Sequence, residues 1–351
     1  MKVLILSNTP QTDLEAAIIL AGHTYDRCDP NDFNMYISES TRGMDSVYRN
    51  DERIYRSTYD CVITRVSRGR NFAARLIEHL QNNLGIFCVQ SGESINTVAD
   101  KFRTAQILSQ NGIRVPRQVF AKNPTHIKHI ISKVGGLPTL LKENSGSQGN
   151  GIILLNDALQ TNMTLQSMYG SEKDIIIQRF LNNGGKDERH IVVNGAIVSS
   201  MERQAPKDDI RSNLSQAGTG RKIEADPETR ELCIKAVAAI AGLNFAGVDV
   251  MKDTDGKPYV IEINSNPGVK IIEITGYNHF KALVKYCEDN YKKGTQSSSV
   301  QNTISVPASA PTNQASSQKI TGSDGKTQYD SWADYVNNDP YYCKIRRELG
   351  I

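Results

Sequence analysis

The sequence predicts a protein of mixed α/β and α+β class in three parts: a small parallel α/β domain, a larger α+β region and a C-terminal tail. Strand and helix patterns alternate up to about residue 92, whereas strand–loop–strand patterns begin at residue 137. An uncharged segment rich in Ser, Gln, Ala and Pro begins at residue 295. These three observations define the three parts.

The composition is that of an ordinary globular protein. The chain has 351 residues, 38% hydrophobic and 23% charged, which argues against wholesale disorder and against collagen-like or coiled-coil structure. Its net charge of +3 is too small to indicate a nucleic-acid partner. No apolar run approaches the roughly 20 residues of a membrane helix, and the N-terminus lacks a signal peptide's apolar core. We therefore expect a cytoplasmic protein without membrane or direct nucleic-acid partners, and several of its scattered cysteines are expected to be buried thiols.

The N-terminal domain is predicted from a strand–helix–strand pattern. We expect a parallel sheet from strands at 2–7, 61–66 and 86–90, flanked by helices at 12–21 and 71–83. The pattern ends near Gly92. Two further helices are expected at 97–111 and 124–134, each ended by glycine.

The second region contains strands LPTLLK and GIILL around a glycine-rich loop, and then two hairpins. The hairpins are expected to turn at Asn194-Gly195 and within DTDG. Between them, Asp226 as N-cap and Pro227 at the first position predict a helix that Gly242 ends. The expected domains are 1–92, 93–187 and 188–293, followed by a tail at 294–351.

The tail begins with a stretch that cannot form a core. Residues 295–318 carry no charge and bury too little apolar surface to offset chain entropy, so we expect a flexible linker and a disordered tail. The segment beyond it holds the only tryptophan, Trp332, and is too short to fold strongly alone. We expect it to dock on this chain or on a partner. Because such a linker reaches about 25–30 Å, the C-terminal carboxylate could also be modified in cis or in trans.

Two carboxylates are predicted to face each other in the DTDG hairpin. A two-residue turn at Asp255-Gly256 places Asp249 opposite Glu262, and Asn264 lies further along the same face. Facing carboxylates repel unless a positive charge lies between them, and Mg²⁺ accepts such oxygen ligands. A solvated face whose charges point apart is the alternative. The other face of the hairpin is expected to be apolar: Val248, Val250, Tyr259, Ile261 and Ile263.

A glycine-rich loop follows Lys142. Its small residues let backbone N–H groups approach an anion, as in phosphate-binding nests. A strand rather than a helix follows, so the loop is not a Rossmann fingerprint, and it lacks the Gly-Lys-Ser/Thr ending of a Walker motif. The loop suits a flap that closes over a triphosphate, and a flexible hairpin loop without a ligand is the alternative.

Basic side chains lie around the first hairpin. The two-residue turn at Asn194-Gly195 places Arg189 near Ser200. Scattered arginines are usually surface charge. A plausible grip for a phosphate or carboxylate follows in IRSNLSQAG: Arg211, Ser212 and Asn213.

The order of these segments resembles the ATP-grasp fold and, more narrowly, its RimK-like branch. The resemblance covers about residues 1–290 and is closest from Asp100 to Gly276. It implies an ATP-grasp fold behind an N-terminal parallel α/β domain, and it does not cover the tail. Seven segments carry it: DKFRTAQIL, LLKENSGSQGNGI, DERHIVVNG, MERQAP, DIRSNLSQAG, NFAGVDV and VIEINSNPG.

The resemblance also implies roles for individual residues. The ATP-binding residues comprise two lysines on the phosphates, the flap, the hinge strand whose backbone receives adenine, a ribose ligand and a phosphoryl-facing group: Lys101, Lys142, Gly146, Ser147, Gln148, Gly149, Gln178, Arg179, Phe180, Asp187, Arg211, Ser212 and Asn213. Of these, Arg211 and Asn213 are the expected catalytic residues. Three arginines are the expected substrate contacts: Arg65, Arg189 and Arg203. Two Mg²⁺ ions, replaceable by Mn²⁺, are expected on Asp249, Glu262 and Asn264, with Glu262 bridging.

The implied activity is that of an ATP-dependent carboxylate–amine ligase. A substrate carboxylate attacks the γ-phosphate of ATP to give an acyl phosphate, and an amine then displaces phosphate to form an amide. The leading expectation is addition of a glutamate-like amino acid to a peptide or protein C-terminus, by a homo-oligomer, a tetramer in this family. The alternatives are a ligase acting on a small cofactor or a peptide natural product, and a nucleotide-binding regulator without turnover.

Overall fold

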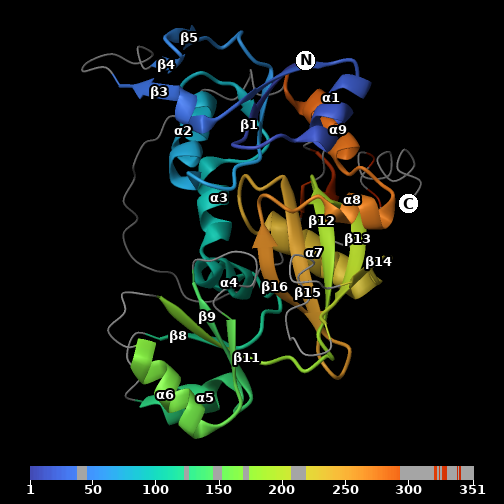
Figure 1. Ribbon diagram of the computed structural model, residues 1–351. Coiled ribbons are helices and arrows are strands. Elements are labelled where there is room, and N and C mark those ends of the chain that lie inside the picture. Colours follow the sequence, from blue (N-terminus) through green and yellow to red (C-terminus); the bar gives the residue numbers. More distant parts are fainter. Residues whose placement is uncertain are drawn as a thin grey trace. The chain divides into compact units, whose positions relative to one another are not determined.

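The computed structural model describes residues 1–37, 46–121, 126–144, 152–168, 174–206 and 219–292. In the tail it describes 320–321, 324, 326–329, 338 and 340. The chain divides into two compact units, Met1–Lys292 and Lys293–Ile351. The first contains the helices and strands that are relevant to function (Figure 1).

A four-stranded parallel sheet opens the first unit. Its order is β2-β1-β6-β7. Residues Val3 to Leu6 of the central strand are all buried, which explains their unbroken apolar run, because a parallel strand is covered on both faces. The predicted parallel α/β arrangement is therefore confirmed. The elements are β1 (Lys2–Leu6), α1 (Thr12–Leu20), β2 (Thr24–Cys28), β6 (Cys61–Thr64), α2 (Arg70–Asn82) and β7 (Phe87–Cys88).

A small antiparallel sheet in the same segment was not predicted. It consists of β3 (Phe33–Tyr36), β4 (Ser46–Arg49) and β5 (Glu52–Ile54), after a short 3₁₀ helix, η1 (Pro30–Asp32). The strands are only three or four residues long, which is too short for an alternation to be recognised. Phe33, Val47 and Ile54 nevertheless join the core below the parallel sheet.

The helix predicted at 97–111 is two helices, α3 (Gly92–Ala99) and α4 (Lys101–Gln110), so that prediction was wrong. Asp100 separates them: its backbone is extended, and its side chain accepts a hydrogen bond from Arg103 N at 2.8 Å, which caps α4. The break makes Lys101 the first residue of α4.

A four-stranded antiparallel sheet with the order β10-β9-β11-β8 comes next. Helices α5 and α6 pack on it, and its core includes Val134, Leu141, Leu165 and Ile177. The glycine-rich loop connects β9 to β10, as predicted, and α6 was not predicted. The elements are β8 (Gln118–Ala121), α5 (Ile127–Val134), β9 (Thr139–Glu143), β10 (Ile152–Leu155), α6 (Ala158–Met168) and β11 (Ile175–Arg179).

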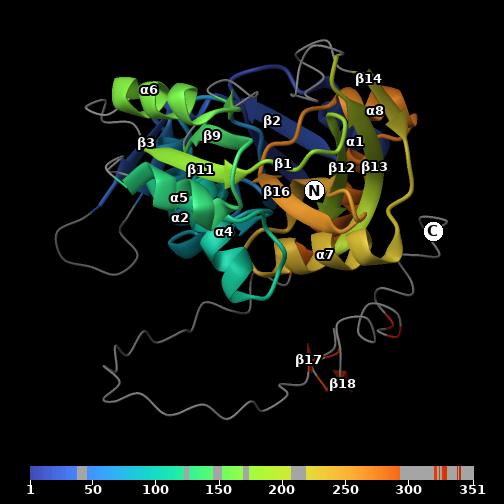
Figure 2. The same ribbon diagram turned by 90° about the horizontal axis from the view of Figure 1, so that it is seen from below.

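A five-stranded antiparallel sheet with the order β14-β13-β12-β15-β16 completes the unit. Helix α7 covers one face (Figure 2), where Val192, Val248 and Val250 are buried. On the other face, Ile191 and Phe245 pack with residues of α9 and of the parallel sheet. The elements are β12 (Lys186–Val193), β13 (Ala196–Gln204), β14 (Thr219–Lys222), α7 (Pro227–Ala238), β15 (Phe245–Lys252), β16 (Pro258–Asn264), α8 (Lys270–Thr275) and α9 (Phe280–Asn290).

The β15–β16 hairpin differs from the predicted turn but keeps the predicted pair. Its last pair is Lys252 with Pro258, so five residues form the loop instead of two. A bulge beside Asp249 then moves the register by one residue, and Asp249 faces Glu262 as predicted.

The same bulge changes the apolar face of this hairpin. Val260 is 2% exposed and packs in the core, whereas the predicted core residues Tyr259 and Ile261 are only partly buried. The expectation for those two residues was therefore wrong.

The β12–β13 hairpin also contains a bulge, between Ile191 and Val192. It makes Arg189 the partner of Met201, and His190 takes the place opposite Ser200. The predicted proximity of Arg189 and Ser200 as partners was wrong for this reason.

Few tail residues are described. Two-residue strands β17 (Ile320–Thr321) and β18 (Gln328–Tyr329) pair antiparallel. The predicted linker at 295–318 and the segment around Trp332 lie outside the described residues. Within the described residues, no helix combines the length and apolarity that a membrane crossing requires.

A tight contact between α2 and α3 provides a test of this fold. A methyl group on Gly92 would overlap the backbone carbonyl of Ala74, whereas one on Gly268 would meet no atom within 4 Å. We expect Gly92→Ala to lower the free energy of unfolding by about 1–3 kcal/mol, because backbone must move. Gly268→Ala is the control and should leave it unchanged or raise it by about 0.4–1 kcal/mol. Equal denaturation midpoints for the two variants would contradict the packing of α2 on α3.

Candidate active site

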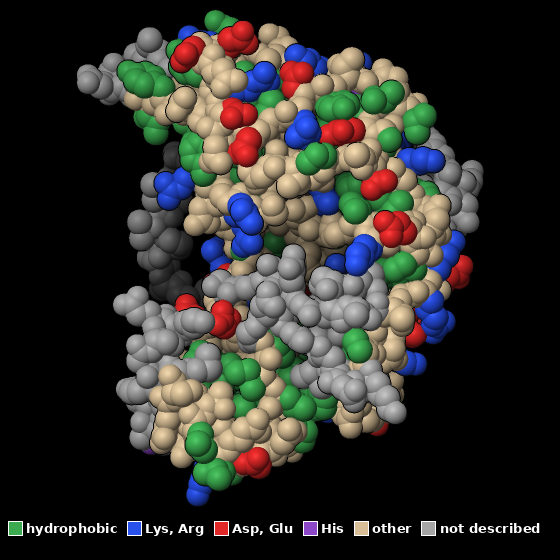
Figure 3. Space-filling view, in the orientation of Figure 1, with side chains coloured by type: hydrophobic (Ala, Val, Ile, Leu, Met, Phe, Trp, Pro, Cys, Tyr) green, Lys and Arg blue, Asp and Glu red, His purple; other side chains and the backbone are tan. Residues whose placement is uncertain are grey.

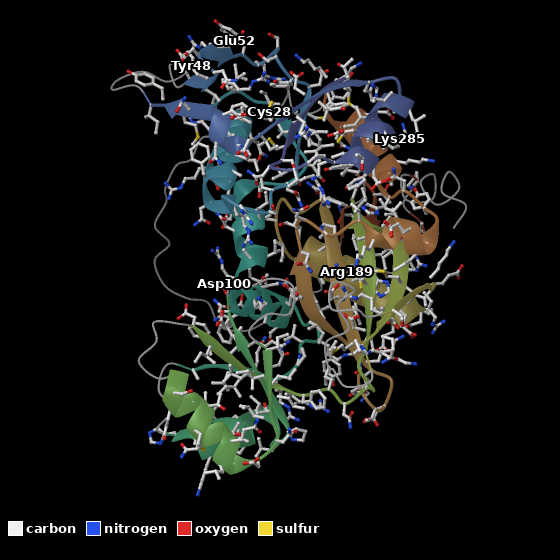
Figure 4. All side chains as sticks on the ribbon, in the orientation of Figure 1. Cys28, Tyr48, Glu52, Asp100, Arg189 and Lys285 are labelled. Carbon is white, nitrogen blue, oxygen red and sulfur yellow. The ribbon has the colours of Figure 1, made fainter. Side chains whose placement is uncertain are left out.

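Three charged side chains form a row across the five-stranded sheet. Arg189 on β12 pairs directly with Asp249 on β15, which pairs with Glu262 on β16. Direct partners in antiparallel strands share a face, so the three side chains lie together. Figure 4 shows Arg189 on this part of the sheet. Asp187 and Arg203, which are also direct partners, extend the row.

Asp249 is held by two guanidinium groups. Arg189 donates from Nε to Oδ1 and from Nη2 to Oδ2, both at 2.7 Å, and Arg203 Nη2 lies 3.0 Å from Oδ2. Asp249 is only 4% exposed. Burial alone would raise the pKa of this carboxyl, but Arg189 and Arg203 hold it at about 2. Asp249 is therefore fully ionised at neutral pH.

Arg203 links two carboxylates in a buried position. It is 1% exposed, donates from Nε to Asp187 Oδ1 at 2.7 Å and from Nη2 to Asp187 Oδ2, and also pairs with Asp249. Burial lowers the pKa of Arg203, but Asp249 and Asp187 raise it by more, so the pKa lies above its usual value and the guanidinium is charged. Asp187, the predicted ribose ligand, thus lies beside the metal-ligand candidates through this arginine.

Among the described residues, Glu262 has no cationic partner comparable to those of Asp249. Burial, reinforced by the charge of Asp249, raises the pKa of the Glu262 carboxyl, and Lys101 and Arg189 only partly oppose this. Close by, Asn264 shares the face, and its Nδ2 is buried without a hydrogen-bond partner among the described residues. A cation near Glu262 would offset both the desolvation of its carboxylate and the repulsion from Asp249.

These donors are chemically suited to a hard divalent cation. Two carboxylates and one side-chain amide offer oxygen ligands, which Mg²⁺ prefers. In the described part of the chain, no group of three or more His, Cys, Asp or Glu side chains is arranged to hold a metal ion. A metal at this position would therefore depend on Asn264 and on oxygens brought by a ligand such as a phosphate. The residues fit a cation on those terms.

A cleft of ≈ 440 Å³, including space open to solvent, lies between α4, the four-stranded antiparallel sheet and β16. In Figure 3, several Lys and Arg side chains surround the hollow on this side of the molecule. Four predicted site residues line the cleft: Lys101, Lys142, Gln178 and Glu262. Its apolar walls include Val98, Leu108, Val115, Ile176, Val260 and Ile261. An apolar slot with lysines and a carboxylate at its border suits a flat, apolar group that carries anions.

Lys142 is buried at the wall of this cleft. Its Nζ donates to Gln178 Oε1 at 2.7 Å, from β9 to the neighbouring strand β11. Burial lowers the pKa of Lys142 to about 8, although the charge of Glu262 opposes the shift. The ammonium group is thus close to titration at physiological pH.

Lys101 approaches the beginning of the glycine-rich loop. Its Nζ lies 3.4 Å from Asn144 O, and Asn144 Oδ1 accepts from Phe102 N at 2.9 Å. The first turn of α4 is therefore attached to the residue where the loop leaves β9. The flap residues Gly146, Ser147, Gln148 and Gly149 lie outside the described residues.

The predicted hinge strand is β11. Gln178 O accepts from Thr139 Oγ1 at 2.7 Å, and Arg179 N donates to Arg117 O at 2.8 Å. Phe180 lies just beyond the end of the strand. The guanidinium of Arg179 lies over the ring of Tyr259, 5.9 Å from its centroid, so this side chain has turned toward β16.

The remaining predicted residues lie elsewhere. Arg65 follows β6 and is 5% exposed, with hydrogen bonds to Gln11 Oε1 at 3.0 Å and to Pro267 O at 2.9 Å. Its substrate contact stays a prediction. The proposed phosphoryl grip lies outside the described residues: Arg211, Ser212 and Asn213.

Sequence reasoning missed several members of the site. Asn144 anchors the loop, and Thr139 supports the hinge strand. Gln118 has a supporting role only: its Oε1 accepts a hydrogen bond from Gln178 Nε2 at 3.1 Å. Asn144 could have been noticed as the polar residue directly before the glycine-rich loop. The apolar wall has no local signal, because its residues come together only in the folded chain.

Comparison with known proteins agrees with this geometry. A family model described as a RimK-like ATP-grasp domain matches residues 98–287. A probable alpha-L-glutamate ligase of Coxiella burnetii is 34% identical over 298 residues, which cover 83% of this chain and 97% of that protein. A homologue with the same name from Saccharophagus degradans is 33% identical over 298 residues, with the same coverage of 83% and 97%.

Solved structures support the same fold. The ATP-grasp ligase PsnB complexed with minimal precursor, Mg and ADP aligns with a TM-score of 0.63 at 17% identity, covering 83% of this chain and 98% of PsnB. The predicted ATP-grasp fold and the predicted ligase class of enzyme are confirmed. The chain belongs to the RimK-like ATP-grasp family.

Proposed function

We propose that this protein is an ATP-dependent carboxylate–amine ligase that adds a glutamate-like amino acid to the C-terminus of a peptide or protein through an acyl phosphate. The row of Arg189, Asp249 and Glu262 beside the lysine-bordered cleft carries the proposal. It brings cations and candidate metal ligands together where an anionic carboxylate must approach an anionic triphosphate.

The nucleotide would occupy the cleft. Its apolar walls suit the adenine, and the backbone at the end of β11, including Phe180, suits the polar edge of the base. Lys101 and Lys142 would neutralise the phosphates, and Asp187 would reach the ribose after exchange of its contact with Arg203. The flap residues Gly146, Ser147, Gln148 and Gly149 would cover the phosphates from above.

Asp249, Glu262 and Asn264 would hold two Mg²⁺ ions, and Mn²⁺ is a suitable substitute. When bound, these ions would supply positive charge to the phosphate oxygens. Arg189 and Arg203 already keep Asp249 ionised, so this ligand needs no deprotonation before a cation binds. That property is useful because proton release would otherwise oppose metal binding.

The arginines would also receive the substrates. Arg189, Arg203 and Arg65 are the proposed contacts of substrate carboxylates, and Arg211 and Asn213 are the proposed catalytic residues that face the transferred phosphoryl group. Arg189 and Arg203 would bind a substrate carboxylate in exchange for part of their contact with Asp249 and Asp187. A guanidinium group binds a carboxylate through two parallel hydrogen bonds, as Arg189 does with Asp249. No protein nucleophile is required, because the substrate carboxylate and amine perform both bond-forming steps.

The relatives support the substrate classes. The homologues named probable alpha-L-glutamate ligase support glutamate as the added amino acid. The titles of PsnB complexed with a minimal precursor and of the macrocyclase MdnC bound with its precursor peptide support a peptide acceptor, and also a second candidate, a ligase for a peptide natural product. A regulator without turnover would not need both lysines and the complete set of metal-ligand candidates.

Glu262 provides the direct test of this activity. When amino acids and peptides are screened with ATP, we expect release of ADP and a gain in the mass of one of the acceptor peptides. Glu262→Gln should reduce this turnover by at least about 10³-fold, because it removes a negative charge that binds the cation. Glu231→Gln is the matched control, because Glu231 is an exposed residue of α7 whose carboxylate lies 2.6 Å from Lys235 Nζ. Nucleotide binding with no turnover across a broad screen would favour the regulator.

The lowered pKa of Lys142 predicts a pH dependence of nucleotide binding. Below pH 8 the ammonium is charged and attracts phosphate, whereas above pH 8 the free protein loses this proton and must regain it on binding. The affinity for a non-hydrolysable ATP analogue, measured by calorimetry, should therefore fall up to about tenfold per pH unit above 8. Lys142→Arg remains charged and should remove this slope. The same slope in both proteins would assign the titration to another group.

A further inference from the structure

The turn that follows Asn264 is attached to the parallel sheet by three side-chain hydrogen bonds. Gln90 Nε2 donates to Ser265 O at 2.7 Å, Arg65 Nη2 donates to Pro267 O at 2.9 Å, and Asn266 Nδ2 donates to Val66 O at 3.0 Å. The residues on the parallel-sheet side directly follow β6 or lie two positions after β7. The carbonyl groups of Ser265 and Pro267 are thus fixed by residues that lie outside the five-stranded sheet.

Gln90 connects both strands that carry metal-ligand candidates. The same Nε2 that donates to Ser265 O also donates to Phe245 O at 2.6 Å. Phe245 begins β15, which carries Asp249, and Ser265 directly follows β16, which carries Glu262 and Asn264. Gln90 is 2% exposed, so both bonds are shielded from competing water.

Close packing reinforces these bonds. Gly247 is the direct partner of Asn264, and a Cβ added at Gly247 would lie 2.8 Å from Pro267 Cβ. The turn therefore folds back over the strand beside Asn264, and only glycine leaves room for it. Arg65 lies with its guanidinium carbon 5.1 Å from the centroid of the Phe280 ring, which fixes the arginine from the other side.

We propose that Gln90 and Arg65 are positioning residues that hold Asn264 in the geometry required for the divalent cation. The inference rests on the proposed function, because it takes Asn264 as a metal ligand. Asn264 is the last residue of β16, where a strand normally begins to fray, and Mg²⁺ demands near-ideal geometry. The hydrogen bonds at residues 265 and 267 remove that freedom before the cation arrives.

A positioning role for Gln90 and Arg65 predicts a different effect on metal affinity from a purely structural role. A hydrogen bond that only joins the two sheets would contribute to stability and leave metal affinity alone. A hydrogen bond that positions a metal ligand affects metal affinity as well. Loss of such a bond outside the coordination shell costs about 10–100-fold in metal affinity. The chain offers a matched comparison. Asn244 Nδ2 donates to Val89 O at 3.0 Å, which joins the same two segments without touching the turn.

The experiment measures Mn²⁺ binding by electron paramagnetic resonance, with the full chain and a non-hydrolysable ATP analogue. We expect Gln90→Leu to weaken Mn²⁺ binding about 10–100-fold. Asn244→Leu should lower thermal stability by a similar amount and change Mn²⁺ affinity less than twofold. Gln90→Asn, which is one methylene too short to reach both carbonyls, should show the effect even if Gln90→Leu folds poorly. Raised Mg²⁺ should restore the turnover of both Gln90 variants.

The outcomes separate the two claims. Equal Mn²⁺ affinity in folded Gln90→Asn and in the unaltered protein would overturn the positioning role while leaving the proposed function intact. An equal loss in Asn244→Leu would also overturn it, because general loosening would then explain the effect. Failure of the unaltered protein to bind Mn²⁺ with the nucleotide analogue would instead overturn the proposed function and the inference with it.

Discussion

The structure depends on how it tolerates Asp249 and Glu262 facing each other on adjacent strands. Two carboxylates in this arrangement repel, and the low polarity of their surroundings strengthens the repulsion. Asp249 is neutralised by Arg189 and Arg203, whereas burial and the charge of Asp249 raise the pKa of Glu262, which has no such ion pair among the described residues. The site therefore has a remaining demand for positive charge, directed toward Glu262 and the neighbouring Asn264.

The rest of the fold brings the correct groups to that point. The cleft places Lys101 and Lys142 from the α4 and β9 side against Glu262 on β16. The break at Asp100 starts α4 with Lys101, and β11 supplies Gln178 to orient Lys142. Charges of both signs thus come from separate segments, and hydrogen bonds to Asn144 and Gln178 hold the two lysines. Such preorganisation is what transfer of a phosphoryl group between two anions requires.

The sequence allowed the sheet classes, the α7 cap at Asp226 and the facing pair Asp249–Glu262 to be predicted. The pair was found because a longer turn and a bulge shift the register in opposite senses. Where only one deviation occurs, as beside Ile191, the predicted partner of Arg189 was wrong. Bulges, the break between α3 and α4 and the walls of the cleft depend on contacts between distant segments, so a local pattern could not predict them. Hairpin register and residue pattern indicated Asp249, Glu262 and Lys142, and the family resemblance added roles for the other candidate residues. The contacts of Arg189 and Arg203 with Asp249 depend on the folded structure.

The central claim is that Asp249, Glu262 and Asn264 hold the divalent cation beside the nucleotide. Anomalous X-ray scattering from crystals grown with Mn²⁺ and a non-hydrolysable ATP analogue tests it directly, because the manganese signal reports position without reference to activity. We expect an anomalous peak within about 2.0–2.3 Å of oxygen atoms of Asp249, Glu262 and Asn264, close to the distances typical of Mg²⁺. Nucleotide in the cleft with manganese bound only at other side chains would contradict it.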